Sequence, residues 1–310
     1  PASNNISTFY NISPYVKEYY NFTTWQNLYN TYDAAISTDY VVQYAVKRYK
    51  NVGGTYTLLS TVTGEFMDGY TEFMDGMNKD SDFYVFLDEG TYLYNYDSDL
   101  PTDQANAMAG TIDLNFTDVN EFIRYTNLRT GVITNIAFSS LGIKTFSRVH
   151  LTNIADGNKV EFLRGASVRW TGTFKAQCEP KYQPVQVDFI NKYGSWSRIF
   201  FQKAKSRNIN VKADSYKLNP AALPYTPSNQ GQVKEFNKTG TESIKLNTGW
   251  VNDGYAEYIQ QLLLSEKVTL LDYENNILYT PVNVQTKSLK KQTGLNDGTM
   301  NYELTFDFAY

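Results

Sequence analysis

Histidine and cysteine are nearly absent from this chain, which has one of each, His150 and Cys178, in 310 residues. A single cysteine cannot form an internal disulfide, so we expect a fold that does not depend on an oxidising compartment. One histidine and one cysteine also cannot fill the tetrahedral shell of a zinc site. A nucleophilic Cys–His pair would require the two residues to meet in space from separate segments. The sequence therefore predicts no catalytic residue, no cofactor and no metal site.

Charge and long apolar runs are scarce as well. Charged residues make up 19% of the chain, against about 25% in typical globular domains. The net charge is −4 and the pI is near 5.2, which argues against a dedicated nucleic-acid binder, because such proteins normally present a basic face. No run approaches the roughly 18 apolar residues of a membrane span. The first residues, PASNNISTFY, lack the features of a signal peptide, so we expect neither a membrane span nor Sec-type export.

Signatures of common enzymes are missing too. No glycine-rich phosphate loop follows a strand and opens a helix, and no Gly-x-Ser-x-Gly elbow occurs. Adjacent carboxylates at Asp88 and Glu89 leave glycoside hydrolysis open, since that reaction needs two acids at the right separation. Sequence alone does not measure that separation. With 32 acidic residues in the chain, such a pair is expected by chance, and we predict that the protein is not an enzyme.

Aromatic residues are abundant, with 26 tyrosines and 18 phenylalanines, and 42% of the chain is apolar. Aromatic side chains favour strands, and a surface that is poor in charge and rich in aromatic residues is typical of protein interfaces. The composition therefore indicates either a β-rich protein that buries surface against neighbours or a protein with large but ordinary sheet cores. Both interpretations remain open at this point.

The last third of the chain has the clearest pattern. Ile244, Leu246 and Thr248 alternate with polar residues, which is typical of a strand with one buried face. Asp253 can then cap a helix over about 253–265, and a final strand ends the chain. The apolar stripe of the helix comprises Tyr255, Ile259, Leu262 and Leu263, and one face of the final strand comprises Tyr302, Leu304, Phe306, Phe308 and Tyr310. These patterns predict an antiparallel sheet covered by one helix.

We expect a mainly β protein with minor α (α+β) in two domains, 1–178 and 179–310, because the two prolines in 178–184 interrupt strand pairing. The N-terminal domain is predicted to be β-sandwich-like with a short helix capped by Ser13, and the C-terminal domain to be a β-barrel or sheet with one helix. A hairpin is expected over 41–63, turning at 51–54. Further strands are expected at 111–116, 131–138, 144–151, 159–163, 166–176, 185–189 and 196–204.

One segment, about 214–240, carries three prolines and almost no periodicity. More than twenty residues without secondary structure are unusual inside a compact domain, and such segments tend to be functional or disordered. We therefore predict an arm that lies on a neighbouring subunit. Its apolar side chains are candidates for assembly contacts, and Trp250 is a further candidate. The arm's candidates are Tyr216, Leu218, Leu223 and Tyr225.

A short duplication lies upstream, where the sequence Glu-Phe-Met-Asp-Gly occurs at 65–69 and again at 72–76. Asp-Gly pairs suit turns, and Phe and Met suit contacts with another surface. The segment is interpreted either as a binding loop or as a structured connection that packs on its own domain.

Two stretches resemble virion structural proteins of tailed bacteriophages that infect Bacteroidota. One runs from Val185 through the sequence DFINKYGSW to Ala204, and the other begins with LNTGWV at 246–251 and continues to Asn301-Tyr302. The similarity covers about 185–310 well, and the first half only through the helix near Ser13. The resemblance implies a virion component assembled in the bacterial cytoplasm. The strand–helix–strands outline is similar to the domains of tail tubes, distal tail proteins and baseplate hubs, which implies a tail-tip or baseplate protein that forms symmetric homo-oligomers with other virion proteins.

An alternative within the same resemblance is a receptor-binding or carbohydrate-binding virion module that contacts a host surface glycan. Exposed aromatic rings on sheet loops stack on sugars. The candidate glycan contacts are Tyr70, Tyr92, Tyr94 and Tyr96. A tail-associated hydrolase is a third alternative, and it requires a positioned pair of acids.

Overall fold

The chain is described here from a computed structural model, in which the structure describes residues 12–20, 34–35, 41–70, 85–95, 111–137, 141–147, 154–177, 181–219, 232–272, 274–275, 277–289 and 298–310. The fold is mainly β, as predicted. In the described part of the chain, two α-helices, α1 (Ser13–Lys17) and α3 (Tyr255–Leu264), and one 3₁₀ turn at Ile154–Asp156 accompany the strands. Helix α1 begins after Ile12 and has no side-chain cap, so the prediction that Ser13 caps it is wrong: Ser13 is already the first helical residue.

The chain forms two compact units. Unit 1 comprises Pro1–Glu179, Asp188–Ile199 and Glu257–Lys267, and unit 2 comprises Pro180–Val187, Phe200–Ala256 and Val268–Tyr310. The first change of unit lies between Glu179 and Pro180, whereas the sequence placed the domain boundary at 178/179. Two later segments nevertheless group with the N-terminal residues, because they carry the ends of two strands and most of α3.

Unit 1 contains a five-stranded and a three-stranded sheet, with strand orders β4-β10-β9-β6-β7 and β1-β8-β5. Strand β4 pairs parallel to β10, and the other pairs are antiparallel. The rings of Phe116 and Phe162 bring the two sheets into contact, with centroids 5.4 Å apart. The strands are β1 (Ala34–Ala35), β4 (Gly90–Asn95), β5 (Thr111–Phe116), β6 (Glu121–Asn127), β7 (Ile133–Ala137), β8 (Gly142–Ser147), β9 (Asn158–Arg164) and β10 (Ser167–Gln177).

Strand β6 lies between β9 and β7 in the five-stranded sheet but was not among the predicted strands. Its buried positions include the charged Glu121 as well as Ile123 and Tyr125. The Glu121 carboxylate accepts hydrogen bonds from the backbone N–H groups of Thr117 and Asp118, at 2.6 and 3.0 Å. A charged residue at a buried position weakens the alternation of apolar and polar residues in the sequence. The hydrogen bonds from the preceding turn compensate for burial of the Glu121 carboxylate.

Unit 1 also includes the ends of β11 (Val185–Ile190) and β12 (Trp196–Phe201), against which α3 packs. The hydroxyl of Tyr258 donates to the carbonyl of Arg198 and accepts from its N–H, both at 3.1 Å. Its ring meets those of Phe189 and Tyr92 edge-on. Three members of the predicted apolar stripe, Tyr255, Ile259 and Leu262, are confirmed as buried. The fourth, Leu263, is only half-buried.

Strands β11 and β12 are buried at every position, including the polar Gln186 and Asp188, which alternate with apolar residues in β11. The buried charges are paired: Arg198 donates to both oxygens of Asp188, through Nε at 2.7 Å and Nη2 at 3.0 Å. Because α3 packs on this end of the strands, neither face is left for solvent.

A seven-stranded sheet, in the order β12-β11-β15-β16-β17-β14-β13, supplies most of unit 2. The predicted inward residues of its centre are confirmed as buried, among them Ile244, Leu246, Leu304 and Phe306. Tyr310 is an exception, because it lies past the end of the last strand and is 82% exposed. The remaining strands are β13 (Ser206–Lys217), β14 (Val233–Asn252), β15 (Val268–Asp272), β16 (Ile277–Val284) and β17 (Thr299–Phe308).

A buried carboxylate, that of Asp272, accepts hydrogen bonds at the turn between β15 and β16 in unit 2. Asp272 is fully buried and accepts from Lys205 Nζ at 2.7 Å and from Asn275 Nδ2 at 2.6 Å. The backbone N–H of Glu274 also donates to it, at 3.2 Å. One side chain thus holds the turn after β15 and the segment that precedes β13.

Candidate assembly surfaces

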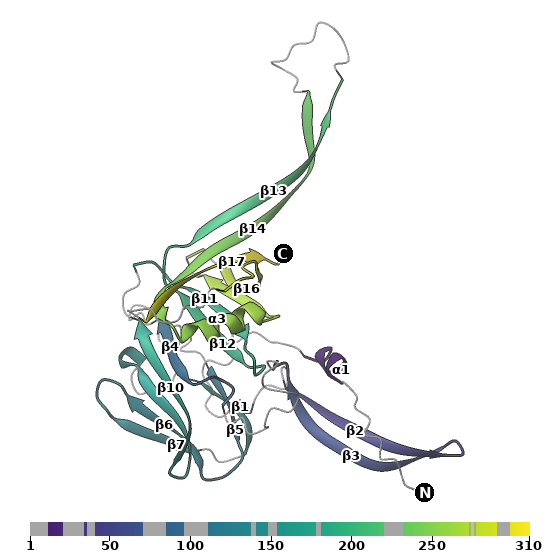
Figure 1. Ribbon diagram of the computed structural model, residues 1–310, viewed down its shortest axis with the longest axis vertical. Helices are drawn as coiled ribbons and strands as arrows, with labels where there is room; N and C mark the ends of the chain where they lie inside the picture. The colour runs from purple at the N-terminus through teal and green to yellow at the C-terminus, as the bar shows by residue number, and fades with distance from the viewer. Residues whose placement is uncertain are drawn as a thin grey trace. The chain divides into compact units, whose positions relative to one another are not determined.

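Strands β13 and β14 continue past the end of β17 as a two-stranded ribbon (Figure 1). Residues 206–208 pair with 243–245, which also pair with β17, whereas 209–217 pair only with 233–242. At ~3.3 Å per residue, this overhang extends about 30 Å. Every residue of β13 is exposed, as is β14 up to Thr241. We call residues 209–217 and 233–242 the C-terminal ribbon.

The C-terminal ribbon contains one irregularity, a bulge opposite Ala213 where the register shifts between Lys212 and Asp214. Asn237 adopts φ 49° there, a left-handed conformation that asparagine tolerates better than most residues. Its Nδ2 donates to Asp214 Oδ2 at 2.9 Å. The hydrogen bond from Lys238 lowers the pKa of the Glu235 carboxyl on the same strand. These polar contacts hold a ribbon that has no core of its own.

Apolar side chains nevertheless occur along the C-terminal ribbon. Four of them, Ile209, Val211, Val233 and Phe236, are between 51% and 62% exposed. Phe236 contacts Tyr216 edge-on, with ring centroids 5.6 Å apart. Exposed apolar residues are normal when scattered singly, but a continuous set on a projecting element marks an interaction surface.

The prediction of an irregular arm over 214–240 is therefore wrong for its two ends, which are paired strands. These strand ends show no alternation in the sequence, because neither face of the ribbon is buried and polar and apolar residues occur on both faces. Of the candidate contacts, Tyr216 lies near the end of β13 and Leu218 directly follows that strand, and both are exposed. Trp250 lies in β14 within the sheet and is 67% exposed. Leu223 and Tyr225 lie outside the described residues.

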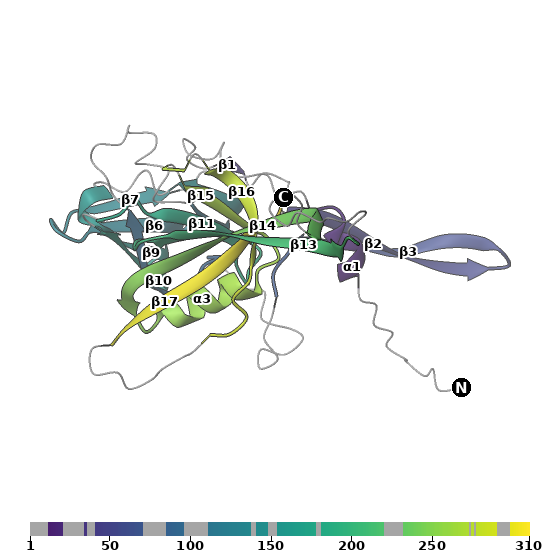
Figure 2. The same ribbon diagram turned by 90° about the horizontal axis from the view of Figure 1, so that it is seen from above.

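A second ribbon is formed by β2 (Val41–Val52) and β3 (Thr55–Met67), which we call the N-terminal ribbon. Among the described residues it pairs with no third strand, and both views draw it as a free-standing pair (Figures 1 and 2). The predicted turn is confirmed: Gly53 and Gly54 have φ 61° and 90°, as a two-residue hairpin loop of this type requires. The side chain of Asn51 accepts from the Gly54 N–H at 3.0 Å.

The N-terminal ribbon is anchored at its base by a close approach of two backbones. The Tyr70 N–H donates to the carbonyl of Lys192 at 2.8 Å. A Cβ on Gly69 would lie 2.5 Å from that carbonyl oxygen, and one on Gly194, which has φ 82°, would lie 2.7 Å from the Asp68 nitrogen. Only glycine fits at these two positions, so the path of the chain out of β3 is fixed against the β11–β12 turn.

The first copy of the duplicated sequence thus belongs to this anchor and is not a loop. Phe66 and Met67 end β3, and Phe66 stacks on Tyr44 with ring centroids 4.3 Å apart. Asp68 and Gly69 follow the end of β3 and lead the chain away from the ribbon. The second copy, at 72–76, lies outside the described residues.

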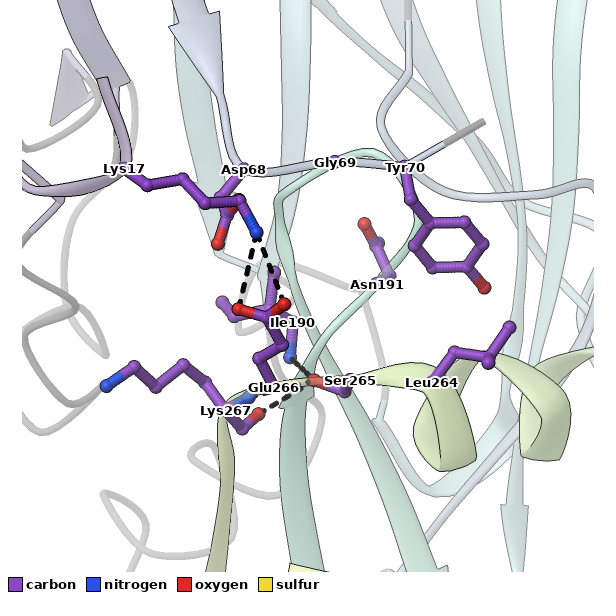
Figure 3. Close-up of a pocket in the computed structure, with 10 residues that line it drawn as sticks. All are labelled: Lys17, Asp68, Gly69, Tyr70, Ile190, Asn191, Leu264, Ser265, Glu266 and Lys267. Atoms are coloured by element: carbon purple, nitrogen blue, oxygen red, sulfur yellow. Dashed lines mark hydrogen bonds and ion pairs between the residues drawn. The ribbon is translucent and has the colours of Figure 1, made fainter. Parts of the chain in front are cut away.

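Charged groups from α1 complete the anchor (Figure 3). Lys17 Nζ lies 3.2 Å from Glu266 Oε1 and 3.5 Å from Asp68 Oδ1. The hydrogen bond to Glu266 raises the pKa of Lys17, and the charges of Asp68 and Glu266 act in the same direction against desolvation. Desolvation, together with the charge of Asp68, raises the pKa of Tyr20 to about 12.

A cavity of about 260 Å³ lies beside these groups, lined by Lys17, Asp68, Gly69, Tyr70, Ile190, Asn191 and residues 264–267. Ser265 Oγ accepts from the Ile190 N–H at 3.1 Å and donates to the Lys267 carbonyl at 2.9 Å (Figure 3). The contacts drawn around the cavity join Lys17 of α1 and Ile190 of β11 to residues 265–267, which follow α3.

Two of the three candidate glycan contacts that the structure describes lie in the core. Tyr92 is buried and Tyr94 is 1% exposed, so neither ring offers a face on which a sugar can stack. Tyr70 is half-buried in the lining of the cavity, and Tyr96 lies outside the described residues.

The carboxylates considered for hydrolysis have structural partners. Asp88 accepts from Tyr193 Oη and Gln261 Nε2, both at 2.6 Å, and Glu89 accepts from the Thr171 N–H at 3.1 Å. Within the described part of the chain, no three His, Cys, Asp or Glu side chains are grouped so that they could hold a metal ion. His150 and Cys178 lie outside it.

Comparison of the chain with protein-family models, with curated proteins and with solved structures gives no match. The two ribbons are therefore interpreted from their geometry and chemistry alone. Among the described helices, none is both long and apolar enough to span a bilayer.

Proposed function

We propose that this chain is a structural component of a tailed-bacteriophage virion, at the tail tip or baseplate, and that it acts by assembling into a symmetric oligomer with copies of itself and other virion proteins. Two kinds of observation support the proposal. The residues at 185–204 and 246–302 resemble such proteins, and both compact units carry an exposed two-stranded ribbon.

The observation that carries the proposal is the C-terminal ribbon. Strand β13 is the outer strand of the seven-stranded sheet, and an outer strand presents a row of unpaired backbone groups to which another chain can pair. Proteins that stay monomeric usually shorten or cover such strands. Here the strand is 12 residues long and exposed throughout, and apolar side chains accompany it. These are properties of a surface that becomes buried when subunits join.

The helix-backed sheet is the second part of the proposal. Helix α3 packs on β11 and β12, and β14 to β17 complete an amphipathic sheet. We propose that this is the C-terminal β domain of tail-tube and distal-tail type, preceded by a β-sandwich-like N-terminal domain. In this scheme assembly is the activity, and no catalytic group is needed.

Mass photometry of the purified chain over a range of concentrations tests the proposal. We expect a species of defined, ring-sized mass beside the monomer. The variant I209T/V211T/F236T removes apolar surface from the C-terminal ribbon while keeping strand-forming residues, and we expect it to shift the population towards monomer. The matched control, V119T/V132T/V168T, changes exposed valines outside both ribbons and should assemble as the parent does.

Location in the particle is tested separately. We expect peptides of the chain in purified virions, and a low-resolution particle map should place it in the tail. A chain that is monomeric at every concentration and missing from the particle would refute the proposal.

A further inference from the structure

The N-terminal ribbon differs from the rest of the chain in charge. From Val41 to Gly64 it contains three cations, Lys47, Arg48 and Lys50, and no carboxylate. None of the three has an ion-pair partner among the described residues, whereas the one acid at its base, Glu65, accepts a hydrogen bond from Gln43. The chain as a whole carries −4, so the remainder is more acidic than that total. The ribbon is therefore a basic element on an acidic protein.

Its apolar residues lie on both faces. Val46 is directly opposite Val62, and Tyr49 is directly opposite Leu58. Because successive side chains of a strand point to opposite faces, Val46 and Tyr49 belong to different faces. Both pairs are solvent-exposed, and Tyr56 and Leu59 extend the apolar set to the turn, with exposed fractions between 47% and 70%.

A ribbon of this kind is stabilised when its apolar side chains are buried against another surface. An isolated two-stranded hairpin is marginally stable in water, because neither face is buried. Strands of 12 and 13 residues give a ribbon about 40 Å long and ~10 Å wide, so its two faces offer on the order of 800 Å². One partner of a stable protein interface contributes about the same area.

We propose that the N-terminal ribbon is an assembly arm that docks on the body of a second copy of this chain. The inference rests on the proposed assembly function and assigns the contact to a different element from the C-terminal ribbon. The acidic remainder of a neighbouring copy attracts the cations Lys47, Arg48 and Lys50, and its surface covers the apolar pairs. The anchor at Gly69 and Gly194 fixes the base of the arm.

Nucleic acid is a poorer fit for the same ribbon. Duplex DNA offers phosphates to the three cations, but its charged backbone offers no apolar surface to the valine, tyrosine and leucine side chains that lie beside them on both faces. Three phosphate contacts also release few counterions, so binding would be weak at physiological salt.

A shortened arm tests the inference. Deleting residues 47–50 and 57–61 joins the pair Val46–Val62 to the pair Asn51–Tyr56, keeps the alternation of faces and retains the glycine turn. The deletion removes all three cations and the Tyr49–Leu58 pair. We expect the variant to fold, as judged by circular dichroism, and to be monomeric in mass photometry under conditions in which the parent chain is oligomeric.

Charge is tested with K47Q/R48Q/K50Q, which we expect to weaken association about tenfold and to remove most of its salt dependence. The control K175Q/K181Q/K287Q makes the same charge change at exposed lysines elsewhere and should associate as the parent does.

The outcomes separate the two proposals. If the parent chain oligomerises and the shortened arm does so equally well, the arm inference is overturned and the assembly function stands. If the parent chain is monomeric throughout, both fail. Salt-sensitive binding of a 30-base-pair duplex by the parent chain, lost on shortening while the oligomer persists, would assign the ribbon to nucleic acid and overturn the inference.

Discussion

The buried pair Asp188–Arg198 provides the sharpest test of how the strand ends and α3 hold together. Both side chains are at most 4% exposed and are joined by two hydrogen bonds. Replacing Arg198 by methionine keeps much of the side-chain volume but leaves the Asp188 carboxylate buried without its cation. We expect R198M to lower the free energy of unfolding by about 3–5 kcal/mol.

The double variant D188L/R198M removes both charges. Because apolar residues of similar volume can replace a buried ion pair at little cost, we expect it to recover most of the loss, to within about 1–2 kcal/mol of the parent chain. The stability should therefore rise when a second substitution is added to the first. D188L alone should be nearly as harmful as R198M, since it leaves a buried guanidinium unpaired.

Urea unfolding followed by tryptophan fluorescence measures the effect, since Trp196 lies in the same strand as Arg198. With a slope of about 2 kcal/mol per molar urea, R198M should move the midpoint down by about 2 M. If the double variant is as unstable as the sum of the two single variants, the reasoning is refuted, and the two groups act through separate partners.

Three further predictions concern the anchor and the β15 turn. Gly194→Ala, which combines a left-handed φ with a steric clash, should cost about 3 kcal/mol in urea unfolding. Gly131→Ala, at φ 71° in open space, should cost about 1 kcal/mol, and equal losses would contradict the clash. Asp272→Ala should cost about 3 kcal/mol, because Lys205 loses its buried partner, whereas the exposed Glu274→Ala should stay within about 0.5 kcal/mol. Tyr20 has its pKa raised in the folded state to about 12, so its contribution to stability is complete below pH 10 and is lost as the pH rises towards 12. The phenolate absorbance at 295 nm that Tyr20→Phe removes should titrate near pH 12, and a midpoint near 10 would show that Tyr20 is exposed.

The final strand and α3 were found where they were predicted, and each has a single buried face. In the final strand, Tyr302, Leu304, Phe306 and Phe308 face the core at every second position. In α3, the buried residues recur at the helical period. Under these conditions the alternation in sequence records the burial directly.

Burial departs from this single-face pattern in two places. Strands β11 and β12 are buried on both faces and still contain Asp188 and Arg198. The ends of β13 and β14 are buried on neither face, and their mixed composition was interpreted as an irregular arm. In both cases the pattern of polar and apolar residues no longer indicates which way a side chain points.

By itself, the sequence determined the mainly β fold, the position of the helix, the glycine turn at 53–54 and the scarcity of groups suited to catalysis, because each of these depends on local composition and spacing. The tertiary structure alone decided that Tyr92 and Tyr94 are core residues and that Asp88 is held by residues more than a hundred positions away. It also decided that, in the part of the chain it describes, two strand pairs extend as ribbons with exposed faces. The reason is physical: exposure and long-range pairing depend on which segments meet in space, and the same strand pattern is compatible with either a covered or an uncovered ribbon.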